Sequence, residues 1–158
     1  MKLNQSNNTL QISFKTKVEI TNSHPKLKPP ISLKSVRNTI NLVMKQENCF
    51  NYYIFVNILR NKDIKALNSA YLKHNYPTDI ITFTYTKGKL IEGELLLGID
   101  EINKNSCLYK TSFKNEFLRV VIHGCLHLLG FTDRTKKEKE LMTEKEDFYL
   151  SKIKKYVS

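Results

Sequence analysis

The chain has 158 residues, of which 26 are Lys or Arg and 15 are Asp or Glu, so its formal net charge is +11. With 41% hydrophobic residues and only 5 glycines, the composition excludes an intrinsically disordered chain and a collagen-like repeat. The longest nearly apolar run, residues 120–129, is half of a membrane span and contains two histidines, so no transmembrane helix is predicted. We expect one soluble globular domain over residues 1–158.

The amino terminus and the cysteines are both typical of a reducing, intracellular compartment. The first residues contain no apolar stretch followed by a small-residue cleavage site, so no secretory signal is predicted. Cys49, Cys107 and Cys125 form an odd set without a CxxC pair, which cannot make a disulfide framework. We predict a cytoplasmic protein with three free, buried thiols.

The positive charge suits a polyanionic partner such as RNA, because phosphate neutralisation and counterion release drive non-specific nucleic-acid binding. Most of the basic residues are lysines, and asparagine and isoleucine are also plentiful, as codon bias in an AT-rich genome would produce. The charge is compatible with RNA binding and does not establish it.

Strand-like and helical segments alternate in the first part of the chain. Strands are predicted at residues 10–20, 52–59, 79–85 and 90–99, the last two joined as a hairpin by the glycine-containing turn 86–89. A helix is predicted at residues 33–46, capped by Ser32, and another at 63–72. The inner face of the second helix is expected to carry the side chains Ile64, Leu67, Ala70 and Tyr71.

The remainder of the chain is predicted to be helical, beginning near residue 100 and resuming after Ser112. Residues 118–129 are apolar on almost every side, which is typical of a buried helix, and Gly130 ends that helix. Residues 135–156 form a charged amphipathic helix, whose inward side chains are predicted to be Leu141, Met142, Phe148, Tyr149 and Ile153. The layout is α+β.

Two histidines on the buried helix are the main functional signal. His123 and His127 are four residues apart, so they lie one turn apart on one face and can ligate a single metal ion. Gly130 can reverse the chain, and Asp133 then offers a carboxylate, which gives the pattern His-x3-His-x2-Gly-x2-Asp. The same offsets carry the ligands of metzincin-type zinc sites, which predicts a metal site at these three side chains.

Structural roles compete with this interpretation. A single histidine on an apolar helix is usually hydrogen-bonded to a backbone carbonyl, and an aspartate after a helix is common in turns. Two histidines at this spacing, followed by Gly130 and Asp133, favour the metal site. Cys125 projects from another face of the helix and is predicted to pack in the core.

The residue after the first histidine narrows the chemistry. A metalloprotease of the HExxH type has its general base there, whereas this chain has Gly124, so a peptidase is disfavoured. Three protein ligands leave a position for water, whose pKa zinc lowers to about 7, so a hydrolase is the natural interpretation. A two-histidine, one-carboxylate set can also hold Fe(II).

Three sequence blocks resemble the YbeY-type endoribonucleases, a family of rRNA maturation factors. Residues 123–130 read HGCLHLLG, matching the family pattern His-Gly-x-Leu-His-Leu-x-Gly that precedes a third metal ligand. Residues 67–71 read LNSAY and 78–83 read TDIITF, which is similar to a second family block, and GELLL at 93–97 is similar to a third. Glu138, Leu141, Met142 and Glu146 fit the closing helix of the family.

The resemblance implies a zincin-like α+β fold, in which a small mixed sheet of about four strands packs with helices and a buried helix carries the metal site. It implies one Zn²⁺ per chain on His123, His127 and Asp133. The activity implied is metal-dependent cleavage of single-stranded RNA in rRNA maturation and ribosome quality control. The partners implied are RNA, particularly ribosomal RNA, and the small ribosomal subunit.

This chain departs from the family pattern at three positions. Asp133 stands where a histidine is common, Glu94 replaces an aspartate, and Leu72 stands where many members have an arginine thought to act on substrate phosphate. The catalytic residue that replaces this arginine is unknown. Candidate contacts to RNA phosphate are Lys73, His74 and Arg119, each of which can also be a plain surface or packing residue.

Two other functions remain open at this point. Without the arginine, the chain could be a non-catalytic ribosome-assembly or RNA-binding factor whose metal only stabilises the Gly130 turn. It could also be a metal-dependent hydrolase of another substrate, which the metzincin-like offsets favour and Gly124 and the basic charge oppose.

Overall fold

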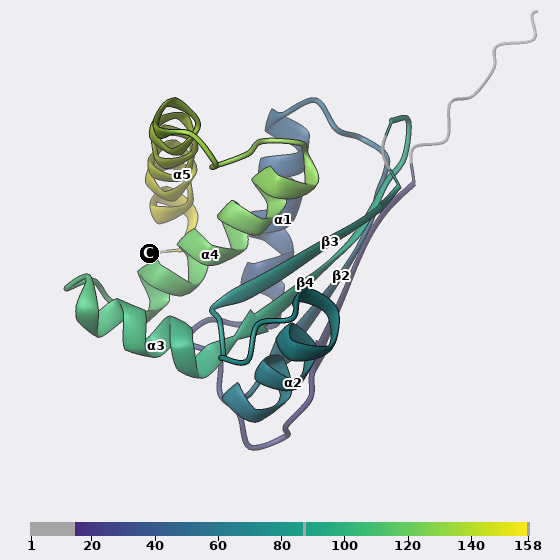
Figure 1. Cartoon of the computed structure of the whole chain (residues 1–158). Coiled ribbons are helices and arrows are strands. Elements are labelled where there is room, and N and C mark those ends of the chain that lie inside the picture. Colours follow the sequence, from purple (N-terminus) through teal and green to yellow (C-terminus); the bar gives the residue numbers. More distant parts are fainter. Residues whose placement is uncertain (1–14, 87, 158) are drawn as a thin grey trace, which may run out of the picture.

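A four-stranded mixed sheet forms the centre of the computed structural model, which describes residues 15–86 and 88–157 (Figure 1). Its strands are β1 (Thr16–Asn22), β2 (Tyr52–Leu59), β3 (Ile80–Thr86) and β4 (Ile91–Gly98), in the spatial order β1-β2-β4-β3. The first, second and fourth strands are parallel, and β3 pairs antiparallel with β4 at one edge. The predicted mixed sheet and the predicted hairpin are both confirmed.

Helices cover both faces of this sheet. They are α1 (Leu33–Gln46), α2 (Asn61–Leu72), α3 (Ile99–Leu108), α4 (Phe113–Leu128) and α5 (Lys136–Val157). One face packs against α1 and α4, with α5 behind them, and α2 covers part of the opposite face (Figure 1). The α+β class predicted from the sequence is confirmed.

Alternating strand residues separate two hydrophobic clusters. On β2, Ile54, Val56 and Ile58 point into the large core shared with α1 and α4. On the other face, Ile81 and Leu96 join a smaller cluster under α2. Ser32 and Ser112 cap α1 and α4, because their hydroxyls accept hydrogen bonds from the first-turn amides of Ser35 and Asn115, both at 3.1 Å.

Helix α4 lies in the middle of the protein, as its apolar sequence predicts. It packs against the sheet and against α1, α3 and α5, and ten of its sixteen residues are buried. Cys125 is fully buried in the core, on a different face from the two histidines, as predicted. The helix approaches the sheet closely at Gly124, above Ile80 and Leu95.

Several predicted burials are wrong. Cys107 is exposed and Cys49 is half-buried, because the first lies at the exposed end of α3 and the second in the loop after α1. Tyr71 is 67% exposed, since Ile64 and the small polar Asn68 form the buried stripe of α2. On α5, Leu141 and Phe148 are exposed, because the stripe that faces the core follows Met142, Glu146, Tyr149, Leu150 and Ile153.

The remaining boundaries differ little from prediction. The predicted strand at 10–20 is described from residue 15, with β1 beginning at Thr16, so residues 10–14 lie outside the described residues. Helix α2 begins at Asn61, two residues before the predicted start. No helix in the described part of the chain has the length and apolar character needed to cross a membrane.

The packing of α4 on the sheet predicts different costs for two glycine substitutions. In Gly93→Ala, the new Cβ would lie 2.7 Å from the backbone carbonyl oxygen of Phe83 and would meet Leu128, and backbone cannot move aside easily. We expect a loss of about 1–3 kcal/mol in the free energy of unfolding. In Gly124→Ala, the Cβ meets the flexible ends of Ile80 and Leu95, and alanine favours the helix, so the loss should be smaller. Urea denaturation measures both, and equal losses would contradict this account.

Candidate metal centre

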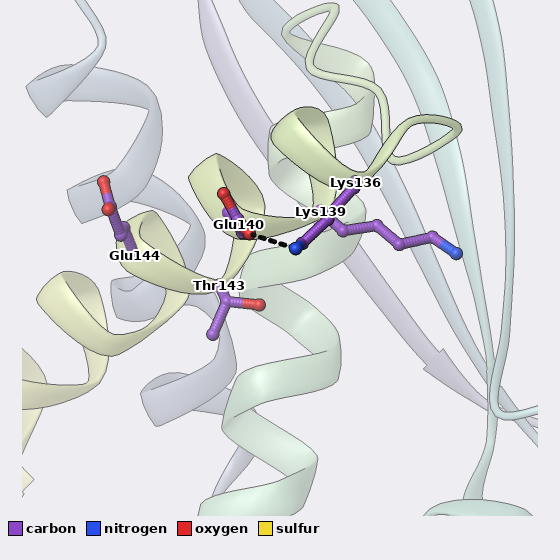
Figure 2. Close-up of a pocket in the computed structure, with 5 residues that line it drawn as sticks. All are labelled: Lys136, Lys139, Glu140, Thr143 and Glu144. Carbon is purple, nitrogen blue, oxygen red and sulfur yellow. Dashed lines mark ion pairs between the residues drawn. The ribbon is translucent and has the colours of Figure 1, made fainter.

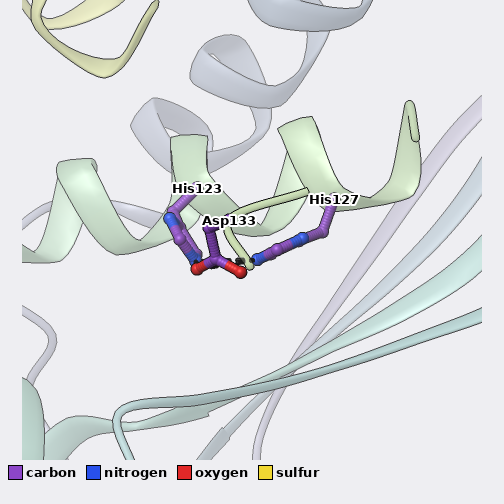
Figure 3. A group of neighbouring side chains, drawn as sticks. All are labelled: His123, His127 and Asp133. Atoms are coloured by element: carbon purple, nitrogen blue, oxygen red, sulfur yellow. Dashed lines mark hydrogen bonds and ion pairs between the residues drawn. The ribbon is translucent and has the colours of Figure 1, made fainter. Parts of the chain in front are cut away.

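His123 and His127 meet on the one stripe of α4 that is not fully buried. Their ring centroids are 4.4 Å apart, and the two Nε2 atoms approach to 2.9 Å (Figure 3). The side chains are 26% and 28% exposed, so both rings are largely desolvated and still accessible from one side. The spacing of four residues predicts that the two rings lie one helical turn apart on the same face, and this is confirmed.

The turn after α4 brings Asp133 back to the two rings. Gly130 has φ +95°, a conformation that favours glycine, and the amide of Phe131 donates to the carbonyl of Leu126 at 3.0 Å. This reversal places the Asp133 carboxylate beside the histidines (Figure 3). Its Oδ2 lies 3.7 Å from Nε2 of His123 and 3.8 Å from Nε2 of His127.

A capping box at the start of α5 holds the far end of this turn. The carboxylate of Glu138 accepts hydrogen bonds from the amides of Arg134 and Thr135, at 2.8 and 3.1 Å. The hydroxyl of Thr135 accepts from the amide of Glu138 at 3.2 Å. The backbone donors hold the pKa of Glu138 below its usual value. Asp133 is therefore fixed between a glycine turn and a capped helix.

The outer nitrogens of both histidines are already engaged. Nδ1 of His127 lies 3.0 Å from the carbonyl oxygen of Phe131, which can only accept, so Nδ1 carries the proton. Nδ1 of His123 donates to Oε1 of Glu146 at 2.7 Å. With both Nδ1 atoms acting as donors, both Nε2 atoms can present lone pairs to one point, as metal-binding histidines do.

Helix α5 holds these outer partners through charged contacts. Arg119 bridges to α5, with Nη1 2.9 Å from Oε2 of Glu146 and Nη2 2.6 Å from Oδ1 of Asp147. The ammonium of Lys145 lies 4.5 Å from the ring centroid of Phe131 and 2.6 Å from the carboxylate of Glu47 at the end of α1. Neighbouring residues of α5 thus stabilise the surroundings of both histidines.

The two histidines have opposite pKa shifts. Burial by itself lowers the pKa of His123, but its hydrogen bond to Glu146 and the charge of that carboxylate outweigh burial, so the pKa is raised. Burial and the neighbouring His123 lower the pKa of His127. The two Nε2 atoms lie 2.9 Å apart, so a proton shared between them in the metal-free site must leave before both can ligate one cation.

The donor set fits a metal ion. His123, His127 and Asp133 each offer one ligand atom, and these atoms lie within 4.8 Å of one another. Ligands of a tetrahedral zinc ion stand roughly 3.3–3.6 Å apart, given metal–ligand bonds of about 2.0–2.2 Å. The observed separations of 2.9, 3.7 and 3.8 Å bracket that range, so small side-chain adjustments would suffice.

A cleft of about 450 Å³ opens beside the histidines, between α4 and the edge strand β3. Its lining residues come from α2, β3, the residue before β3, and α4, and they are Leu72, Asp79, Ile80, Ile81, Thr82, Thr84, His123 and His127. Leu72 therefore occupies the cleft wall, at the position where many relatives were expected to have an arginine. Among the described residues that line the cleft, none is Lys or Arg.

The other predicted phosphate contacts have different surroundings. Arg119 is bound to the two carboxylates of α5. Lys73 is exposed and ends α2 in a left-handed conformation, with φ 58°. His74 is exposed, and its ring stacks on that of Tyr76.

A second hollow, of about 650 Å³, runs along the exposed side of α5 (Figure 2). It is lined by Lys136, Lys139, Glu140, Thr143 and Glu144, all from one helix. Lys136 and Glu140 form an ion pair at 4.0 Å across one helical turn. The lining residues carry mixed charges, and none of them comes from a second element that faces α5. This hollow therefore lacks the converging donors that the cleft has.

Glu146 is the main site residue whose role the sequence did not reveal. It lies 23 positions after His123, so no local spacing connects the two. Its weak sequence signal is a glutamate on the otherwise apolar inward stripe of α5, where a buried carboxylate needs a partner. Asp79, the residue before β3, was likewise missed as a cleft residue, because the cleft forms only where β3 packs against α4.

Comparisons with known proteins agree with this architecture. The sequence profile of the family described as Endoribonuclease YbeY matches residues 11–154. A protein named Endoribonuclease YbeY from Chloroherpeton thalassium is 38% identical over 127 residues, which cover 80% of this chain and 90% of that protein. One of the same name from Chlorobium phaeovibrioides is 34% identical over 133 residues, covering 84% and 88%.

A solved structure also shares the fold. The solution structure of TM1509 from Thermotoga maritima superposes with a TM-score of 0.65 at 25% identity, covering 87% of this chain and 89% of that one. The fold and the three converging donors define an α+β protein with a possible metal site on its buried helix. Within that class, the chain belongs to the YbeY endoribonuclease family.

The position of Asp133 predicts how substitutions affect metal binding. Asp133→Ala should weaken zinc affinity at least about 100-fold, because one of three donors is lost. Asp133→His should recover affinity to within about tenfold of the original protein, since it supplies a nitrogen donor from the same turn. Competition with a chromophoric zinc chelator measures the zinc affinity of the original protein and of both variants. Equal affinities would exclude Asp133 from the site.

Because Glu146 contacts His123 and is not itself a ligand, substitution of Glu146 should weaken zinc affinity less than substitution of Asp133 does. Glu146→Gln keeps the shape of the side chain but removes its charge, so zinc affinity should fall about 10- to 100-fold. Asp147→Asn is the matched control, because Asp147 is the next residue of α5 and contacts Arg119 rather than a histidine. The same chelator competition applies. An unchanged affinity in Glu146→Gln would show that this carboxylate does not support the ligand.

Proposed function

We propose that this chain is a metal-dependent endoribonuclease that cleaves single-stranded RNA, with one Zn²⁺ held by His123, His127 and Asp133. The observation that carries this proposal is the convergence of three donor atoms within 4.8 Å beside an open cleft. Family membership supports the reaction, because the relatives are named as endoribonucleases.

The protein's own residues hold the metal ion and orient the side chains that bind it. A zinc ion bound here would supply Lewis acidity, polarising a scissile phosphate and activating water for attack. His123 and His127 are kept in the ligating tautomer by Glu146 and by the carbonyl of Phe131, respectively. Both rings are largely desolvated, which strengthens electrostatic interactions at the cleft.

We assign the binding of the RNA backbone to exposed cations that follow Asp133 and Leu72 in the chain. A run of exposed basic residues follows Asp133 directly, in the turn and the first turns of α5, and it comprises Arg134, Lys136, Lys137 and Lys139. Lys73 directly follows the cleft residue Leu72 and is exposed as well. We infer that these side chains bind the phosphates flanking the scissile one, which makes binding strongly salt-dependent.

The substrate we propose is ribosomal RNA, cleaved in the cytoplasm during maturation and quality control of the small ribosomal subunit. This follows from the family to which the chain belongs. The net charge of +11 supports association with an RNA-rich particle.

RNA cleavage by the zinc-loaded protein tests the proposed function. His127→Ala should lower the rate of cleavage of a labelled single-stranded RNA at least about 100-fold, because a metal ligand is lost. Its affinity for RNA, measured by fluorescence anisotropy, should change little, since lysines and arginines supply that affinity.

His24→Ala is the control, because His24 pairs with Asp63 at 2.7 Å and does not line the cleft. It should cleave RNA at the original rate. Equal cleavage by the His127 and His24 variants would show that the activity comes from a contaminant, and no cleavage by the original protein would reject the enzyme assignment.

A further inference from the structure

We propose that His74 and Tyr76 form a stacking subsite for one unpaired nucleobase at the mouth of the metal cleft. This inference rests on the proposed function, because it assumes that single-stranded RNA occupies the cleft. It adds a binding site to that function and gives a physical reason for selecting unpaired over paired RNA.

The loop that carries the two rings begins and ends at the cleft. Leu72 and Asp79 both line the cleft, so residues 73–78 arch from one part of its wall to another. His74 is two residues from Leu72 and Tyr76 is three from Asp79, which limits their Cα atoms to about 8 and 11 Å from those wall residues. Both rings therefore lie within reach of a nucleotide near the one that is cleaved.

The two rings already form a stack. Their centroids are 5.3 Å apart and their planes differ by 14°, and the Tyr76 hydroxyl lies 3.1 Å from Nδ1 of His74. Tyr76 is 54% exposed, and His74 is exposed as well. An exposed, nearly parallel aromatic pair can accept a further planar ring on its outer face.

Buried contacts hold this exposed pair in place. Asn68, which is 1% exposed, donates from Nδ2 to the carbonyl of Tyr76 at 2.9 Å. The carbonyl of the same asparagine accepts from the amide of His74 at 3.3 Å, and Lys73 adopts the left-handed conformation that ends α2. The platform is therefore formed before a ligand arrives, which reduces the entropy lost on binding.

The charge around the platform favours RNA over other occupants. Residues 73–78 contain no acidic side chain and include Lys73, which can contact a neighbouring phosphate. The exposed Tyr85 contrasts with this arrangement, because its hydroxyl donates to the carboxylate of Glu94 at 2.6 Å, and that charge would repel a phosphate backbone. The His74–Tyr76 pair combines exposed aromatic rings, an adjacent cation and continuity with the metal cleft.

An unpaired base is the ligand class that this geometry selects. In a duplex both faces of each internal base are stacked on its neighbours, so no face is available to Tyr76. In a single strand the base can turn onto the ring, and sequence matters little because every base has an aromatic face.

Steady-state cleavage of a single-stranded RNA by the zinc-loaded protein tests the subsite. Tyr76→Ala should raise KM about 5- to 100-fold, as expected for one lost base stack, and leave zinc affinity unchanged. Tyr76→Phe keeps the ring and should stay near the original KM. Tyr109→Ala is the matched control, because Tyr109 is a similarly exposed tyrosine at the end of α3 and does not line the cleft.

Abasic substitution in the RNA identifies the stacked base. One abasic position should raise the KM of the original protein to that of Tyr76→Ala, and it should have no further effect on the variant. His74→Ala provides a second test if Tyr76→Ala is poorly folded. A normal KM in both Tyr76→Ala and His74→Ala would overturn the subsite, and the loop would then be left to another partner, such as a protein. The same rise in KM in Tyr109→Ala would also overturn the subsite.

Binding separates the two proposals. If the original protein does not cleave RNA, the proposed function fails, and anisotropy with uncleaved RNA still measures whether Tyr76→Ala weakens binding of single strands. Weaker binding of single-stranded RNA with unchanged binding of duplex RNA supports the subsite. Equal changes for both forms of RNA overturn it.

Discussion

The burial of α4 is the constraint on which the rest of the site depends. Ten residues of this helix are buried between the sheet and three other helices, so its rotation and height are fixed by packing. His123 and His127 lie on the remaining stripe, and their positions are therefore set by side chains that never contact a ligand. A helix less deeply buried could rotate, and the 2.7 Å contact of His123 with Glu146 on α5 would then vary.

Helix α5, at the carboxyl-terminal end of the chain, also fixes the orientation of the two histidines. Glu146 orients His123 directly, whereas Lys145 contacts Phe131, whose carbonyl orients His127. The two residues are adjacent in sequence, so one helical turn of α5 supports both ligands. Correct docking of α5 on α4 is therefore a condition for a well-formed site, and the partly buried Arg119–Glu146 ion pair links that docking to the geometry of His123.

The cleft differs from the surrounding surface in the charged side chains that it presents. The described lining residues include Asp79 and the two histidines but no Lys or Arg, while exposed cations lie at the turn after Asp133 and at Lys73. In the proposed function, the exposed cations provide affinity for the RNA backbone, and the His–His–Asp group holds the metal ion. Leu72 contributes an aliphatic side chain to the cleft wall.

The mixed sheet was implied by the resemblance to the family, because the parallel pairing of distant strands has no local sequence signal. Sequence patterns alone determined the elements, the hairpin, the buried character of α4 and the grouping of His123, His127 and Asp133. These properties follow from local spacing, because helix and strand periods and the Gly130 turn act over a few residues. The tertiary structure alone decided the partnership of Glu146 with His123, the place of Asp79 in the cleft, and the exposure of Tyr71, Leu141 and Phe148. These depend on how elements far apart in the chain dock, since an amphipathic pattern gives a helix a buried side but does not say which neighbour covers it or how wide the covered stripe is.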